Sequence, residues 1–157
     1  QTCALPISEV ITLASFVQEE AGNDQDSNVA QVFRNRLAEG SPYPKPQSTT
    51  SSYVQSDEDN NYLWNWVAPY YGGWEDIPEN IRNAYDTYTC TGLPAGPISN
   101  PGLAAIQAAL APQCDEEVRD CYFFVTDLSG HYYYAKTYAE HQANCRKAAE
   151  VNQSLKK

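Results

Sequence analysis

Two adjacent glutamates near the start of the chain, Glu19 and Glu20, are side chains that could transfer protons. Apolar residues recur at helical spacing over residues 9–21, which predicts a helix in this segment. At about 100° per residue, Glu20 lies on the shoulder of the apolar face, whereas Glu19 lies roughly opposite it. The predicted apolar face consists of Val10, Leu13, Ala14, Val17 and Ala21.

This placement gives the two carboxyl groups different environments. Burial beside Leu13 and Phe16 disfavours the ionised form, so we expect the pKa of Glu20 to lie above the usual glutamate value of about 4.3. A carboxyl that keeps its proton near neutral pH can donate it to the leaving oxygen of a glycosidic bond. Glu20 is therefore the candidate acid, although a glutamate at a helix shoulder is often an ordinary surface residue.

Residues 85–102, with the sequence YDTYTCTGLPAGPISNPG, form a second candidate for function. The glycines and prolines restrict the backbone and leave few regular hydrogen bonds, as in many loops that carry binding or catalytic groups. A well-packed structural loop that leads into a helix remains the alternative on these residues alone.

The cysteines are many for a reducing cytosol but too few for a full disulfide framework; they are Cys3, Cys90, Cys114, Cys121 and Cys145. Two of them, Cys114 and Cys121, flank a short acidic stretch and could close a small loop. Cys145 with His131 and His141 could suggest a metal site, but their spacing matches no standard zinc pattern, so we expect none.

The composition describes a globular chain without a basic surface. The 157 residues suit one domain, and 42% of them are hydrophobic and 19% charged. A net charge of −10 argues against a nucleic-acid partner, and no apolar run approaches the roughly 20 residues of a membrane span. The chain has 12 Tyr and 3 Trp against 4 Phe, which suits wet, sugar-like ligands or, alternatively, the cover of a modest core.

The elements that must position these groups can be predicted in part. A second helix is expected over about residues 27–39, with Asp26 or Ser27 as its N-cap and Gly40 at its end. Its apolar face consists of Val29, Phe33 and Leu37. Residues 41–84 begin with a loop rich in Pro, Ser and Thr, and the aromatic stretch 57–76 within them reads as a helix and a loop without clear bounds.

The second half of the chain has sharper signals. A helix over about residues 100–111 is predicted, with Asn100 as its N-cap and Pro101 in its first turn. The apolar face of this helix consists of Leu103, Ile106 and Leu110. Residues 121–136, CYFFVTD, LSG and HYYYAK, predict two strands joined by a turn.

The last helix is expected to begin at Thr137, whose side chain forms a capping box with Glu140, and to run to about Ser154. The predicted order is helix, helix, irregular middle, helix, hairpin, helix. This order favours an α+β fold, with a single domain whose helices pack with a small antiparallel β element.

Four segments together resemble the YceG-like family, also called MltG, of endolytic murein transglycosylases. LASFVQEEAG at residues 13–22 is similar to the family's L-A-S-I-V-E-K-E-A/T helix, and VFRNRL at residues 32–37 to its V-F-x-N-R-L. The segment 85–102 resembles Y-N-T-Y, G-L-P-P-G-P-I and S-N-P-G, and the hairpin with its following helix start resembles Y-F-V-A-D-G-x-G-G-H-x-F-x-x-T-x-x-E-H. The segments follow the family's order from about residue 10 to about residue 150.

The resemblance implies a role for several residues of this chain. The family's catalytic glutamate falls on Glu20, the residue that the helical periodicity selects independently. Candidate substrate contacts are Gln47, Ser48, Tyr85, Asp86, Tyr88 and Asn100. The chain departs from the family pattern at Thr49, where an Asp is usual, and at Asp86, where an Asn is usual, and either change could reduce activity.

The resemblance also implies where the chain belongs. The opening QTCALPI resembles a translated sequencing adapter, so we interpret residues 1–7 as a non-native leader and residues 8–157 as a lytic transglycosylase catalytic domain. We expect a longer natural protein whose family-typical membrane anchor and LysM-like domain lie upstream, with the catalytic domain on the extracytoplasmic face of the bacterial membrane. In that compartment a Cys114–Cys121 disulfide is predicted.

The implied reaction is the non-hydrolytic cleavage of peptidoglycan between N-acetylmuramic acid and N-acetylglucosamine, which leaves 1,6-anhydro ends and needs no cofactor. Peptidoglycan glycan strands are then the substrate, and cell-wall synthases are candidate partners. Two alternatives stay open. One is a hydrolytic muramidase with Asp86 as a second carboxylate, and the other is a non-catalytic peptidoglycan-binding domain.

Overall fold

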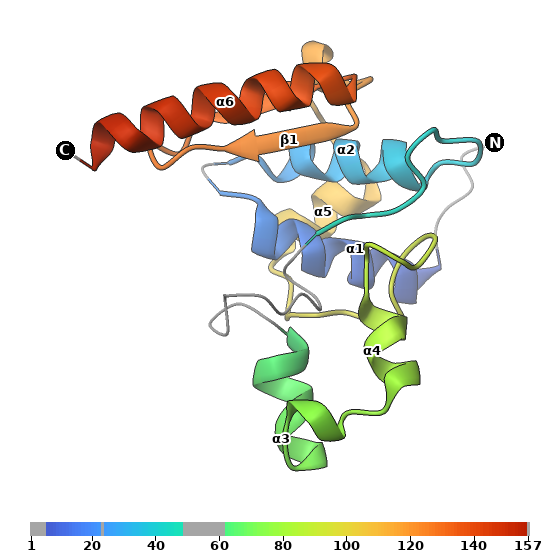
Figure 1. Ribbon diagram of the computed structural model, residues 1–157. Helices are drawn as coiled ribbons and strands as arrows, with labels where there is room; N and C mark the ends of the chain where they lie inside the picture. Colours follow the sequence, from blue (N-terminus) through green and yellow to red (C-terminus); the bar gives the residue numbers. More distant parts are fainter. Residues whose placement is uncertain (1–5, 23, 49–61, 157) are drawn as a thin grey trace.

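The computed structural model describes residues 6–22, 24–48 and 62–156, which form an α+β fold, as predicted (Figure 1). The departure at Thr49 and the first part of the aromatic stretch lie outside the described residues. The α-helices and strands are α1 (Ile7–Glu20), α2 (Asp26–Leu37), α3 (Ala68–Tyr71), α4 (Glu79–Tyr85), α5 (Leu103–Leu110), β1 (Phe123–Thr126), β2 (Tyr132–Ala135) and α6 (Tyr138–Leu155). A π-helical segment covers Leu63–Val67, and 3-10 turns cover Trp74–Asp76 and Glu116–Val118.

The main core lies where α1, α2 and α5 meet. Four residues of the predicted apolar face of α1 are buried, while Ala21 is half-buried; the four are Val10, Leu13, Ala14 and Val17. Phe16 is also buried and contacts Phe33 of α2 edge to face, with 6.0 Å between the ring centroids. The buried face predicted for the first helix is therefore confirmed, and this helix ends at Glu20.

Helix α5 differs from its prediction in its start and in most of its buried face; of the three predicted apolar residues, Ile106 packs against the main core and the two leucines are exposed. It begins at Leu103, because the chain stays extended through Gly102, whose N–H donates a hydrogen bond to Gln18 (2.8 Å), so Asn100 is not its cap. Leu103 and Leu110 are 71% and 57% exposed. The residues that α5 buries are Ala105, Ala108 and Ala109. These small side chains let α5 approach α1 and α2 closely, and leucines on that face would push the helices apart.

The predicted caps of the other helices have different outcomes. Neither Asp26 nor Ser27 caps α2; the Ser27 hydroxyl instead accepts a hydrogen bond from the N–H of Gln113 (3.2 Å). At α6 the predicted capping box is confirmed. The Thr137 hydroxyl accepts from the N–H of Glu140 (3.2 Å), and the Glu140 carboxylate accepts from the N–H of Thr137 (2.9 Å).

The predicted hairpin is present, and it lies between α6 and α2 (Figure 1). Its strands pair antiparallel, from Phe123 with Ala135 to Thr126 with Tyr132. Asn144 of α6 donates to the carbonyl of Tyr134 (3.1 Å), which ties the helix to β2. The result is a thin two-stranded layer with one helix on each side.

The turn of the hairpin is organised by the buried side chain of Asp127. Its carboxylate accepts hydrogen bonds from the hydroxyl of Ser129 (2.5 Å), the hydroxyl of Tyr133 (2.9 Å) and the N–H of His131 (3.2 Å). These donors, the Ser129 hydroxyl first, lower the pKa of Asp127 to about 2. The turn is therefore held by an ionised carboxylate at neutral pH.

Residues 62–85 form a small helical unit, here called the aromatic lobe, which lies below α1 in Figure 1. It has a core of its own, made of Leu63, Ala68 and Ile77. Tyr62 and Tyr85 contact both this core and the main one, with 5.3 Å between their ring centroids. The sequence pattern left this segment without clear bounds, because its short turns follow no single periodicity.

The cysteines do not pair as predicted. Cys114 and Cys121 are both free thiols, so the predicted disulfide is wrong. Cys121 packs instead into a small cluster with Val32 and Val118. Within the described part of the chain, no group of three or more His, Cys, Asp or Glu side chains could hold a metal ion. No helix in that part combines the length and the apolar character that crossing a membrane requires.

Candidate active site

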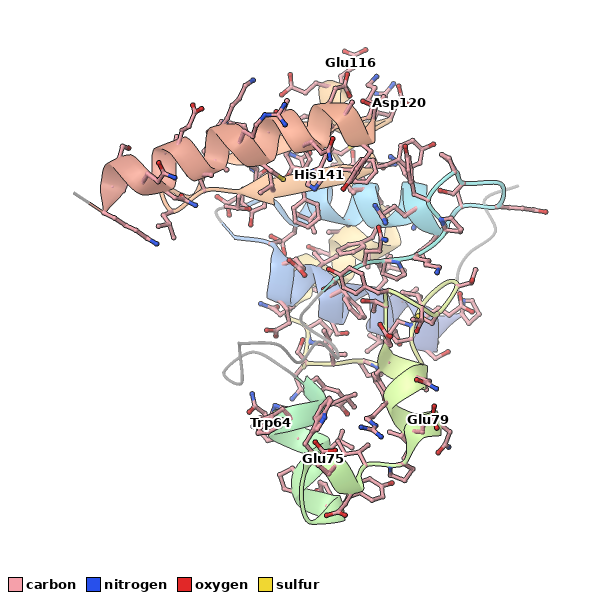
Figure 2. All side chains as sticks on the ribbon, viewed as in Figure 1. Trp64, Glu75, Glu79, Glu116, Asp120 and His141 are labelled. Carbon is pink, nitrogen blue, oxygen red and sulfur yellow. The ribbon has the colours of Figure 1, made fainter. Side chains whose placement is uncertain are left out.

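A cavity of about 370 Å³ opens between the end of α1, the second half of α2, the segment before residue 49, β1 and the start of α6. Its lining includes Glu20, Gln47, Ser48, Tyr88 and His141. Figure 2 shows His141 below α6, on the side that faces α2. The cavity is thus lined by segments from both halves of the chain.

Glu20 is the last residue of α1 and is half-buried, whereas Glu19 is exposed, so the predicted difference between their environments is confirmed. The hydroxyl of Ser48 donates a hydrogen bond to Oε1 of Glu20 at 2.5 Å. The backbone at Glu20 is held from the hairpin, since the hydroxyl of Tyr132 donates to its carbonyl (2.8 Å) and accepts from the N–H of Gly22 (2.9 Å). Side chain and backbone of Glu20 are therefore anchored by separate elements.

Ser48 is held in turn by Thr87, which is completely buried. The N–H of Ser48 donates to the hydroxyl of Thr87 (3.1 Å), and that hydroxyl donates to the carbonyl of Ser48 (2.6 Å). The N–H of Gln47 donates to the carbonyl of Thr87 (3.1 Å). One threonine therefore engages both polar groups of the Ser48 backbone.

Arg36 of α2 is buried at 4% exposure and reaches the same segment. Its guanidinium donates to the carbonyls of Lys45 (2.6 Å) and Tyr122 (2.9 Å) and to the side-chain oxygen of Gln47. It also lies 5.2 Å from the ring centroid of Phe123. Burial lowers the pKa of the guanidinium from its ordinary value. The three acceptors tie α2, the segment before residue 49 and the residue that precedes β1 together.

His141 lines the cavity, although the sequence pattern did not select it as a site residue; it closes the T-x-x-E-H part of the fourth recognised segment. Its ring stacks on Phe123, with 5.1 Å between the centroids and 19° between the planes. Burial first, and then the charge of Arg36, lower the pKa of His141, which favours the neutral imidazole at physiological pH. Its Nε2 lies 3.6 Å from the thiol of Cys145 on the next turn.

The structure brings together some of the predicted site residues and separates others. Gln47, Ser48 and Tyr88 line the cavity with Glu20, but Tyr85, Asp86 and Asn100 do not. Tyr85 joins the aromatic lobe to the main core, where burial raises its pKa. The Asp86 carboxylate accepts from the N–H of Tyr88 (2.9 Å), and Asn100 is exposed in the turn before α5.

Three residues that position the site were not predicted: Arg36, Thr87 and Tyr132. Arg36 lies in the VFRNRL segment and Thr87 in the YDTY segment, so both were inside recognised patterns without being selected. Tyr132 is one of three consecutive tyrosines, and a strand pattern alone does not say which of them reaches the end of another element.

Comparison with known proteins identifies what this chain is similar to. The sequence model of the YceG-like family matches residues 1–147. The chain is 31% identical over 154 residues to an endolytic murein transglycosylase of Streptococcus pneumoniae, and 30% identical over 136 residues to one of Bacillus subtilis. These matches cover 96% and 86% of the chain, but only 25% and 33% of the relatives' own length.

The fold has a solved counterpart as well. The crystal structure of a YceG-like protein from Listeria monocytogenes superposes with a TM-score of 0.58 at 26% identity, over 87% of this chain and 38% of that one. Sequence and fold agree with the resemblance carried by the motifs around Glu20, Arg36 and Thr87. This chain belongs to the YceG-like family.

Proposed function

We propose that this chain carries the catalytic site of an endolytic lytic transglycosylase, a lyase that cuts peptidoglycan glycan strands without water. The observation that carries the proposal is the half-buried Glu20, which faces the cavity and accepts a 2.5 Å hydrogen bond from Ser48. Relatives named endolytic murein transglycosylase, at about 30% identity over most of the chain, support it.

In the proposed reaction Glu20 acts first as an acid and then as a base. It donates its proton to the oxygen that links C1 of N-acetylmuramic acid to N-acetylglucosamine, and the C1–O bond breaks. The Glu20 carboxylate then takes the proton from the C6 hydroxyl of the same muramic residue. The C6 oxygen bonds to C1 and closes the 1,6-anhydro ring, and Glu20 is protonated again for the next turnover.

The surroundings of Glu20 suit both steps. It ends α1, where the partial negative charge of the helix favours a neutral carboxyl over a carboxylate, as the acid step requires. The Ser48 hydroxyl donates to the carboxyl and so stabilises the carboxylate formed after that step. The Tyr132 hydroxyl fixes the Glu20 backbone, which limits how far the carboxyl can move between the steps.

A hydrolytic muramidase needs a second carboxylate beside the scissile bond to activate water or attack C1. Among the described residues that line the cavity, Glu20 is the one carboxylate, and Asp86 is not in the lining. In the proposed reaction the internal C6 hydroxyl, rather than water, is the acceptor. The hydrolase is the alternative reaction that product analysis must exclude.

The proposal extends to substrate contacts and to location. Gln47, Ser48 and Tyr88 line the cavity and are the proposed contacts with the glycan strand. We further propose that the chain acts on the extracytoplasmic side of the bacterial membrane, where peptidoglycan lies, and that cell-wall synthases are its protein partners.

The test compares Glu20→Gln with Glu19→Gln on purified peptidoglycan, with products identified by mass spectrometry. Glutamine keeps the shape but cannot transfer the proton, so Glu20→Gln should lose at least roughly 10²–10⁴-fold in rate, and Glu19→Gln should keep most of it. The parent should release 1,6-anhydro ends. Reducing ends would identify a hydrolase, while binding without turnover in the parent would identify a binding domain.

A further inference from the structure

The backbone of Gln47 is held in a conformation that side-chain-bearing residues rarely adopt. Its φ is +55°, in the left-handed region, and it is not a glycine. Such a conformation persists only where the surroundings hold it, and residues of this kind cluster at functional sites. Gln47 immediately precedes Ser48, whose hydroxyl contacts Glu20, so the strained residue sets the direction of the site's hydroxyl donor.

Two buried side chains from distant parts of the chain hold this segment. Thr87 lies after α4 and bonds the N–H and the carbonyl of Ser48 with a single hydroxyl, while its own carbonyl accepts from the N–H of Gln47. Arg36 lies on α2 and bonds the carbonyl of Lys45 and the side chain of Gln47. The backbone is thus held by hydrogen bonds two residues before the left-handed residue, at that residue and at the residue after it.

We propose that Thr87 and Arg36 are positioning residues that set the Ser48 hydroxyl against Glu20; this rests on Glu20 being the acid/base of the proposed function. Neither residue acts on the substrate in this proposal. Thr87 fixes the backbone of Ser48, and Arg36 fixes the turn that precedes it. Together they fix the orientation in which the Ser48 hydroxyl donates its 2.5 Å hydrogen bond to Oε1 of Glu20.

The hydroxyl of Thr87, rather than its bulk, is the group that carries the effect. Valine has nearly the same shape but can neither accept from the Ser48 N–H nor donate to the Ser48 carbonyl. Serine keeps the hydroxyl and loses one methyl group. A structural role based on packing would therefore be preserved better by Thr87→Val, whereas the positioning role is preserved better by Thr87→Ser.

The chain offers a matched control at Thr89, two residues further on. Its hydroxyl donates to the carbonyl of Asp86 (3.3 Å) on an exposed part of the same loop. For Arg36 the control is Arg34 on the same helix, which donates to the carbonyl of Ala109 (2.9 Å) at the end of α5. Thr89→Val and Arg34→Lys therefore report the cost of losing comparable hydrogen bonds elsewhere.

The experiment measures kcat, KM and the pH profile of anhydro-product formation, with thermal unfolding as a check on folding. Thr87→Val should lower kcat about tenfold to a hundredfold with KM nearly unchanged, since displacement of a catalytic group by about 1 Å can have an effect of this size. Thr87→Ser should recover most of the loss, and Arg36→Lys should lower kcat more than Arg34→Lys. Thr89→Val should stay within about twofold of the parent.

A double variant separates positioning from general stability. If Thr87 acts through Ser48, then Thr87→Val combined with Ser48→Ala should be no slower than Ser48→Ala alone. Additive losses, or a Thr87→Val enzyme with parental kcat and pH profile, would overturn the positioning role. Failure of the proposed function has a different signature, because either the parent would then release no anhydro ends or Glu20→Gln would retain cleavage, whatever the Thr87 variants do.

Discussion

Removal of the Ser48 hydroxyl should change the pH dependence of cleavage in a defined direction. The hydroxyl donates to the Glu20 carboxyl at 2.5 Å, and a donor of this kind stabilises the ionised form. In Ser48→Ala the carboxylate loses that stabilisation, so Glu20 keeps its proton to higher pH. Since Glu20 must be protonated at the start of each turnover, the alkaline limb of the profile should move to higher pH.

The size of this shift follows from the geometry. A hydrogen bond to a charged group contributes about 1.5–3 kcal/mol. Glu20 is half-buried, so water replaces part of the lost bond, and the lower end of that range applies. With about 1.4 kcal/mol for each pH unit, the limb should move by about one unit. The plateau rate should fall at the same time, because the carboxylate formed after the acid step is no longer oriented by Ser48.

The assay follows the release of anhydro-muropeptides from purified peptidoglycan at limiting substrate between mildly acidic and alkaline pH. Ser99→Ala is the matched control, because the Ser99 hydroxyl also bonds α1, at the carbonyl of Ser15 (3.1 Å), but does not contact Glu20. That variant should keep the parental limb. If the alkaline limb of the Ser48→Ala profile lies at the same pH as that of the parent, or at lower pH, the role assigned to the hydroxyl is refuted.

Four further variants test the surroundings of the site and the hairpin that supports it. Tyr132→Phe removes the hydroxyl that bonds the Glu20 backbone and should lower both kcat and stability (the latter by about 1–2 kcal/mol). Tyr134→Phe, two residues along the same strand, removes a hydroxyl that bonds Gln25 and should cost stability without the loss in kcat. Asp86→Asn should leave the alkaline limb unmoved, because Asp86 does not line the cavity; a shift to lower pH would instead indicate coupling with Glu20. The pKa of Asp127 is lowered from 3.8 to about 2. Its contribution to the free energy of unfolding is therefore present above about pH 4 and is lost as the pH falls through about 2. Denaturant unfolding of Asp127→Asn should lack this dependence on acid pH.

The elements near the site were predictable where periodicity determines burial. The spacing of apolar residues in α1 identified its buried face, and with it the half-buried position of Glu20 and the exposed position of Glu19. The capping box at Thr137 was predictable because it is a contact between neighbours in sequence. Local patterns of this kind depend on the geometry of a single element and not on what that element meets.

The errors arose where another element decides the outcome. In α5 the large apolar residues suggested the buried face, but close packing against α1 and α2 selected the alanines and left Leu103 exposed. The spacing of Cys114 and Cys121 permits a disulfide, but Cys121 is buried beside Val32 and Val118 and stays a free thiol. Neither result can be derived from one segment, because each depends on the space that a distant segment leaves.

The candidate site is the strongest case of this dependence. Four separate parts of the chain supply the residues of the site, which are Glu20, Ser48, Thr87 and Tyr132. The hydrogen bonds that join them are long-range contacts, which no periodic pattern in the sequence predicts. The family pattern brought attention to the right segments, yet within YDTY it favoured the large tyrosines and the acidic residue over the small threonine. Thr87 is the one residue of that motif that is fully buried and engages the neighbour of Glu20. A buried hydroxyl with both hydrogen bonds made to backbone groups has a strict geometry, and we infer that this geometry, rather than substrate contact, is why a threonine occupies the position.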